Sequence, residues 1–148
     1  MGSIVVCIDI NNISETAVRF ACLSACKQNH KLHIAIAIDG SHQNFLFGGR
    51  AISTQKRKQV EKNICSLLEK ICQEFKITPA ISISEGDVVL EIFKAIKTVA
   101  DCKLVVFGKS QSFGSDNSVL PKIIRYLGNK INVPVMIIPN GIDYNFFL

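Results

Sequence analysis

The segment that most suggests chemistry is an apolar strand that ends in a glycine and leads through a polar loop into a helix. The strand is expected over residues 104–107, Gly108 follows it, and a helix begins near Pro121. Free backbone N–H groups at the start of a helix bind anions, and glycines let a phosphate approach them. The segment therefore predicts a phosphate-binding loop. Its expected ligands are Ser110, Ser112 and Gly114, with Ser115 and Ser118 as further hydroxyls.

The elements that must position this loop follow from hydrophobic periodicity. Continuous apolar runs predict strands over residues 3–8, 32–38, 80–83, 104–107 and 133–138. Apolar stripes at helical spacing predict helices over residues 14–29, 60–75, 87–100 and 120–131. Residues 40–50 show no period and are expected to form a loop. Pro121 is acceptable only in the first turn of its helix.

Strands that alternate with helices predict a three-layer, doubly wound α/β fold with a five-stranded parallel sheet. A chain of 148 residues is expected to form one domain, residues 1–148. Ligands of such sheets bind beyond the carboxyl ends of the strands, where the strand order switches. The candidate binding positions are accordingly Asp9, Asn11, Ile38 and Gly108, together with the loop and Lys122.

Charge and hydropathy exclude several classes of partner. The net charge is +5, and its densest cluster is Arg50, Lys56, Arg57 and Lys58. No aromatic residues are interleaved with this cluster, so it predicts a solvated helix face rather than a nucleic-acid surface. No apolar run reaches the length of a membrane span, and Asp9 interrupts the first run too early for a signal peptide. We expect a cytoplasmic protein that binds neither nucleic acid nor membrane.

Cysteines and histidines show no spacing typical of a metal site or a catalytic site. The six cysteines include no C-x-x-C pair. We expect all six to be reduced, small apolar groups on or beside buried faces; they are Cys7, Cys22, Cys26, Cys65, Cys72 and Cys102. The three histidines, at positions 30, 33 and 42, have no acidic partner in sequence. We therefore expect no metal and no enzymatic activity.

Three motifs together resemble the universal stress protein family, over nearly the whole chain. The first runs from Asp9 to Ala17, the second is Glu85-Gly86-Asp87, and the third extends from Gly108 to Pro134-Val135. The resemblance implies the strand order 3-2-1-4-5 and a homodimer that forms through the last strand. It also implies that Asp9 holds ribose or adenine. From the residues alone, Asp9 could equally cap the first helix region or a neighbouring loop, Ile38 could simply be core, and Gly108 could simply end a strand.

The third motif departs from the nucleotide-binding form of the family, which has glycine, two residues, glycine, nine residues, and then Gly-Ser or Gly-Thr. Gly108 matches, but Gln111 replaces the second glycine and Pro121-Lys122 replaces the final pair. Gln111 adds a side chain where close approach is needed, and Pro121 has no N–H to donate. Lys122 replaces a hydroxyl with a positive charge, and Lys109 lies beside Gly108.

Two functions stay open at this point. The first is a non-enzymatic, dimeric stress-response or regulatory protein that has no cofactor and does not bind ATP tightly. Gln111 and Pro121-Lys122 favour it. The alternative is a module that binds ATP, another adenine nucleotide or an anion through a modified phosphate loop. Asp9, Gly108 and the serine-rich loop favour this alternative.

Overall fold

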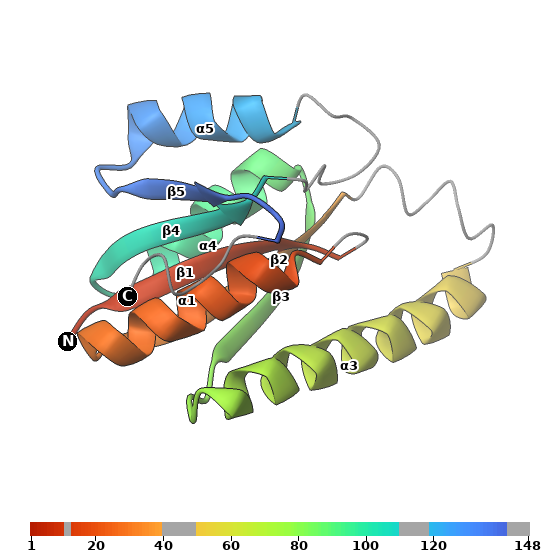
Figure 1. The fold of residues 1–148 in the computed structure, drawn as a ribbon. Helices are drawn as coiled ribbons and strands as arrows, with labels where there is room; N and C mark the ends of the chain where they lie inside the picture. The colour runs from red at the N-terminus through yellow and green to blue at the C-terminus, as the bar shows by residue number, and fades with distance from the viewer. Residues whose placement is uncertain (11–12, 40–49, 110–118, 142–148) are drawn as a thin grey trace.

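A computed structural model describes residues 1–10, 13–39, 50–109 and 119–141 and shows one parallel sheet flanked by helices (Figure 1). The elements are β1 (Ser3–Asp9), α1 (Glu15–Gln28), β2 (Lys31–Asp39), α3 (Arg50–Glu74), β3 (Ala80–Gly86), α4 (Val88–Thr98), β4 (Cys102–Gly108), α5 (Val119–Lys130) and β5 (Val135–Ile138). Neighbouring strands follow the order β3-β2-β1-β4-β5, and every pair is parallel. The predicted α/β fold and the strand order implied by the resemblance are both confirmed.

Two helical layers cover the sheet because alternate side chains of each strand point to opposite faces. Ile4, Val6 and Ile8 of β1 pack in a cluster with residues of α1 and α3. Val5 and Cys7 pack in a second cluster with residues of α4 and α5. Figure 1 shows α1 and α3 on one side of the sheet and α5 on the other. β1 is therefore buried along its whole length, as its unbroken apolar sequence predicted.

The helix α3 begins at Arg50, ten residues before the predicted start at Val60. The predicted loop over residues 40–50 is wrong at its last residue, and residues 40–49 lie outside the described part of the chain. Residues 50–59 are rich in Lys, Arg and Gln, which are good helix formers but provide no apolar stripe. Lys58 is exposed, as expected for a solvated face.

Three helices end before the apolar stripes that predicted them. The stripe residues beyond the helix ends are Phe75, Val99, Ala100 and Ile131. Phe75, Val99 and Ile131 nevertheless pack against the two core clusters. The chain leaves the helical path near two of these ends because Lys76 and Asp101 adopt positive φ angles of 57° and 52°. Hydrophobic periodicity in a sequence indicates which residues are buried, and buried residues can follow the last helical residue. The apolar stripes therefore predicted helix ends that were too late.

The strands also differ from their predicted bounds at several ends. β3 continues to Gly86, and β4 begins at Cys102, two residues earlier than predicted. β5 begins at Val135 rather than at Val133. Pro134 explains this late start because proline has no N–H for the ladder, although its carbonyl accepts a 3.0 Å hydrogen bond from the Val105 N–H. None of the described helices combines the length and apolar character needed to cross a membrane.

Candidate functional site

The candidate site lies at the carboxyl edge of the sheet, between the ends of β1 and β4. β1 leads into α1 on one face, whereas β4 leads towards α5 on the other face. Cys7 pairs with Phe107, and the two strands continue from this pair to Asp9 and Gly108. Adjacent strands whose connections diverge to opposite faces leave a crevice between them, which is where ligands of this class of sheet bind.

Asp9 is the last residue of β1 and is almost completely buried, with 1% of its surface exposed. It lies in register with Ala37 of β2. The alternation of β1 places Asp9 on the same face as Val5 and Cys7, towards α4 and α5. Ser14 is the N-cap of α1, so the interpretation of Asp9 as the cap of that helix is wrong. The interpretation of Asp9 as the cap of a neighbouring loop stays a prediction.

Ile38 belongs to the core, as the alternative interpretation predicted. Its side chain is 3% exposed, and it pairs in register with Glu85 of β3. By the alternation of β2, Ile38 lies on the same face as Ile34 and Ile36, towards α1 and α3. Asp9 and Ile38 thus belong to opposite faces of the sheet at the same edge.

Gly108 ends β4 beside the edge strand β5. It pairs in register with Ile138, and the next backbone N–H, that of Lys109, donates a 2.9 Å hydrogen bond to the Ile138 carbonyl. The first amide after the glycine is thus used by the sheet. Gly108 occupies the position predicted for it, but the Lys109 N–H beside it is engaged within the protein.

The start of α5 carries two of the departures from the nucleotide-binding motif. Pro121 is the third residue of this helix, and Lys122 follows it; both are exposed. The first four N–H groups of a helix have no intrahelical partner and are the ones available to an anion. Pro121 removes one of these four donors. Lys122 instead contributes a positive charge near the positive end of the helix dipole, which favours an anion nearby.

The start of α1 contains polar residues that the sequence analysis did not include in the site. The Ser14 Oγ accepts a hydrogen bond from the Ala17 N–H (3.3 Å) and donates one to the Asn140 Oδ1 (3.4 Å). The Gly141 N–H donates to the Thr16 Oγ1 (3.4 Å). These two hydrogen bonds therefore connect the segment after β5 to the start of α1. The N-cap preference of serine could have identified Ser14, but no sequence signal connects Asn140 to it.

A third helix starts at the same edge, after β3. Gly86 has a φ of 151°, and a β-carbon there would lie 3.1 Å from the Glu91 Oε1. Asp87, the first residue of the predicted helix over residues 87–100, caps α4, because its Oδ1 accepts a hydrogen bond from the Leu90 N–H at 3.2 Å. The carboxylate of Asp87 therefore acts as the N-cap of α4.

The remaining candidate residues lie outside the described part of the chain. They are Asn11, Ser110, Ser112 and Gly114, together with Gln111, Ser115 and Ser118 of the same loop. Of the predicted site, the structure thus places Asp9 and Gly108 on neighbouring strand ends, Ile38 in the core one strand away, and Lys122 on α5.

The described histidines have structural partners. The His30 Nδ1 accepts a hydrogen bond from the Gly2 N–H at 3.0 Å, and the His33 Nε2 lies 2.9 Å from the Ser82 Oγ. Burial lowers the pKa of His33 below its ordinary value. His42 lies outside the described residues. No group of three or more His, Cys, Asp or Glu side chains within the described ranges could hold a metal ion.

The cysteines divide by burial. Cys7, Cys22 and Cys72 are buried, as predicted, whereas Cys65 and Cys102 are half-buried. Cys26 is exposed, so its predicted burial is wrong. The buried stripe of α1 includes Cys22 and Ala25. Cys26 lies at the solvent-exposed side of this stripe. Burial raises the pKa of the Cys7 thiol well above its usual range, which is typical of an inert core cysteine.

Comparison with solved structures gives consistent matches at low sequence identity. A universal stress family protein from Burkholderia pseudomallei is 18% identical, with a TM-score of 0.68 over 93% of this chain and 96% of that one. The universal stress protein from Archaeoglobus fulgidus in complex with dAMP is 18% identical, with a TM-score of 0.58 over 93% and 98% of the two chains. A universal stress protein in complex with cAMP is 20% identical, with a TM-score of 0.61 over 93% and 96%.

The chain has the universal stress protein fold. This conclusion rests on the topology and on these structural neighbours, since no protein-family model and no curated protein sequence matches the chain. In the universal stress protein fold of this chain, Asp9 ends β1 and Gly108 ends the neighbouring strand β4. At the start of α1, Ser14 and Thr16 form hydrogen bonds with Asn140 and Gly141 of the same chain. At the start of α5, Pro121 lacks one backbone N–H donor.

Proposed function

We propose that this chain is a non-enzymatic regulatory protein of the universal stress type, which acts as a dimer and does not bind ATP tightly. The observation that carries the proposal is the position of Pro121, the third residue of α5. A phosphate at this helix start would meet one N–H fewer than at an ordinary helix. The engaged N–H of Lys109 removes a second backbone donor near Gly108.

The alternative function is an adenine-nucleotide-binding module with a modified phosphate loop. Two of the structural neighbours were solved with dAMP and cAMP. Asp9 lies at the end of β1, where a carboxylate could accept hydrogen bonds from ribose hydroxyls. Lys122 could supply the charge that the missing donor would otherwise provide. A nucleotide with fewer phosphates than ATP would suit this version of the site.

The two functions differ in what the purified protein should carry. Tight nucleotide sites often retain their ligand through purification, because residence times lengthen as affinity rises. We expect denaturation of the purified protein to release no stoichiometric adenine-absorbing material. One nucleotide released per chain, identified by its mass, would instead establish the alternative.

The proposed dimer forms through β5, one of the two edge strands. β5 is an apolar strand of four residues, and Ile137 on it is 41% exposed. The other edge strand, β3, contains Ser82, Ser84 and Glu85 and is less suited to an apolar interface. An exposed apolar edge is prone to pairing, so a second copy of β5 would protect it.

Light scattering on a matched pair of variants tests the dimer. We expect the natural protein to be dimeric at tens of micromolar, a range in which modest interfaces persist. The substitution Ile137→Lys places a charge on the proposed interface and should give monomers. The control Val60→Lys changes a similarly exposed apolar residue (46%) on α3 and should leave the dimer intact. A natural protein that is monomeric at this concentration, or two variants that behave alike, would refute the β5 interface.

A further inference from the structure

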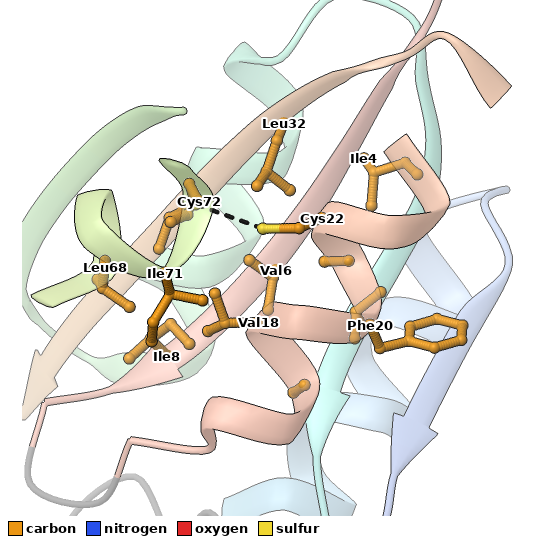
Figure 2. Close-up of a cluster of buried hydrophobic side chains, with 14 of the residues drawn as sticks. Ile4, Val6, Ile8, Val18, Phe20, Cys22, Leu32, Leu68, Ile71 and Cys72 are labelled. Atoms are coloured by element: carbon orange, nitrogen blue, oxygen red, sulfur yellow. Dashed lines mark hydrogen bonds between the residues drawn. The ribbon is translucent and has the colours of Figure 1, made fainter. Parts of the chain in front are cut away.

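Two thiols from different helices touch inside the core formed by α1, α3 and the sheet. The Sγ atoms of Cys22 on α1 and Cys72 on α3 are 3.4 Å apart, although the residues are 50 positions apart in sequence. Both side chains are buried, with none of their surface exposed. Figure 2 shows them pointing towards each other between Leu32 and Ile71.

The two thiols are chemically unequal. The Cys22 thiol donates a hydrogen bond to the Cys72 sulfur. This bond favours the thiolate of Cys72 and lowers its pKa, whereas the same bond and burial raise the pKa of Cys22. Because the thiolate is the reactive form of cysteine, this hydrogen bond favours attack by Cys72, and the 3.4 Å contact places Cys22 to react with whatever forms on it.

The geometry allows a covalent bond after a small movement. A disulfide bond is about 2.05 Å long, so the two sulfurs need to approach by roughly 1.4 Å. Cys72 lies two residues before the end of α3 at Glu74, and the chain then turns through Lys76 at a positive φ of 57°. The last turn of a helix is easier to displace than its middle, because fewer hydrogen bonds hold it.

One end of the contact between α1 and α3, close to Cys22 and Cys72, is exposed to solvent at Cys26. Cys26 lies one helical turn beyond Cys22 on α1 and is exposed. Its Sγ is 3.2 Å from the carbonyl oxygen of Phe75, three residues after Cys72. The pair itself is buried, so a small oxidant would reach it when the α1–α3 contact opens on the side of Cys26.

We propose that Cys22 and Cys72 form an oxidation site, at which a peroxide converts the two thiols into an intramolecular disulfide. The Cys72 sulfur attacks one oxygen of hydrogen peroxide; an S–O bond forms, the O–O bond breaks, and one water leaves. The Cys22 sulfur then attacks the Cys72 sulfenic acid; the S–S bond forms, the S–O bond breaks, and a second water leaves. The two thiols lose two electrons and two protons in total, and the peroxide gains them.

The cross-link would change the physical properties of the protein independently of any nucleotide. It ties α1 to α3 and closes a loop that contains β2. A loop of this length restricts the unfolded chain substantially, so the oxidised protein should unfold at a temperature about 5–10 °C higher than the reduced one. This inference goes beyond the proposed function and does not depend on it.

Thiol counting and peptide mapping on the full chain test the proposal. We expect the reduced protein to take up six alkyl labels under denaturing conditions, matching its six cysteines. After treatment with hydrogen peroxide at a few equivalents, two labels should be lost and the intact mass should fall by two hydrogen atoms. Trypsin should then release residues 20–27 linked to residues 71–76, and the protein should run as a single chain on a non-reducing gel.

Alanine variants assign the bond, because residues 20–27 contain both Cys22 and Cys26. Cys22→Ala and Cys72→Ala should each abolish the loss of two hydrogens. Cys26→Ala and the control Cys65→Ala, on the same helix as Cys72, should retain it. Six remaining labels in the treated natural protein, or a cross-link that persists in Cys22→Ala, would overturn the proposal. If a core variant fails to fold, the peptide map of Cys26→Ala decides the question, because Cys22 is then the one cysteine in residues 20–27.

Discussion

The starts of α1 and α5 face the same edge of the sheet but differ in how their polar groups are used. At α1, Ser14 caps the helix and contacts Asn140, and Thr16 accepts the Gly141 N–H. At α5, Pro121 takes one donor from the first turn, and Lys122 adds a charge. The first helix start is held by the chain that follows β5, whereas the second offers an incomplete set of donors.

This difference separates what the fold requires from what a ligand would require. A helix start that is satisfied within the protein stabilises the fold and needs no ligand. A helix start that binds phosphate needs several N–H groups free and closely approachable. In this chain the start of α1 has the first arrangement, whereas at the start of α5 Pro121 lacks one N–H group that the second would use.

The largest expected effect comes from restoring the phosphate loop. The triple variant Gln111→Gly, Pro121→Gly and Lys122→Ser should bind ATP more tightly than the natural protein, because it regains an N–H and close backbone approach. One hydrogen bond to a charged group contributes about 1.5–3 kcal/mol, or roughly tenfold to more than a hundredfold in affinity. Calorimetric titration of both proteins measures the change.

Lys130→Ser provides the charge-matched control, since Lys130 lies in the last turn of the same helix. It should leave ATP affinity unchanged. An unchanged affinity in the triple variant, with the fold intact by circular dichroism, would show that the start of α5 does not limit nucleotide binding.

The next effect concerns stability at the start of α1. Ser14→Ala removes the N-cap and the contact with Asn140, so it should reduce the free energy of unfolding by about 1 kcal/mol. The control Ser24→Ala lies inside α1, where alanine is a better helix former, and should change stability by less than about 0.5 kcal/mol. Urea unfolding measures both, and equal losses in the two variants would argue against the capping role of Ser14.

A smaller effect is expected at the segment after β5. Asn140→Ala removes a neutral hydrogen bond of 3.4 Å, near the upper limit for such bonds, and should cost about 0.5 kcal/mol. Asn132→Ala, at an exposed position before β5, is the control and should cost less. If Asn140→Ala costs more than Ser14→Ala, the segment after β5 matters more to α1 than its own cap does.

Much of the fold could be predicted because each element buries a recognisable pattern. The apolar run of β1 predicted a strand covered on both faces, and the stripe through Ala17, Val18 and Ala21 predicted α1. The first ten residues of α3 escaped prediction because their helical preference is not accompanied by an apolar stripe. Burial also continues past helix ends, which is why Val99 was assigned to α4.

The candidate site was less predictable because it depends on contacts between distant segments. Sequence could indicate that Asp9 and Gly108 end their strands, but the contact between Ser14 and Asn140 spans 126 positions. It could likewise not show that the Lys109 N–H is engaged by Ile138. The contact between Cys22 and Cys72 was missed for the same reason, since two separate helices bring the thiols together.

The most direct test of the central claim is a calorimetric titration of the natural protein with ATP and magnesium. The loss of one donor at Pro121 and of close approach at Gln111 could together weaken a micromolar site to about millimolar affinity. We therefore expect no saturable heat at micromolar ATP. Micromolar binding with one ATP per chain would contradict the account and would favour the nucleotide-binding alternative.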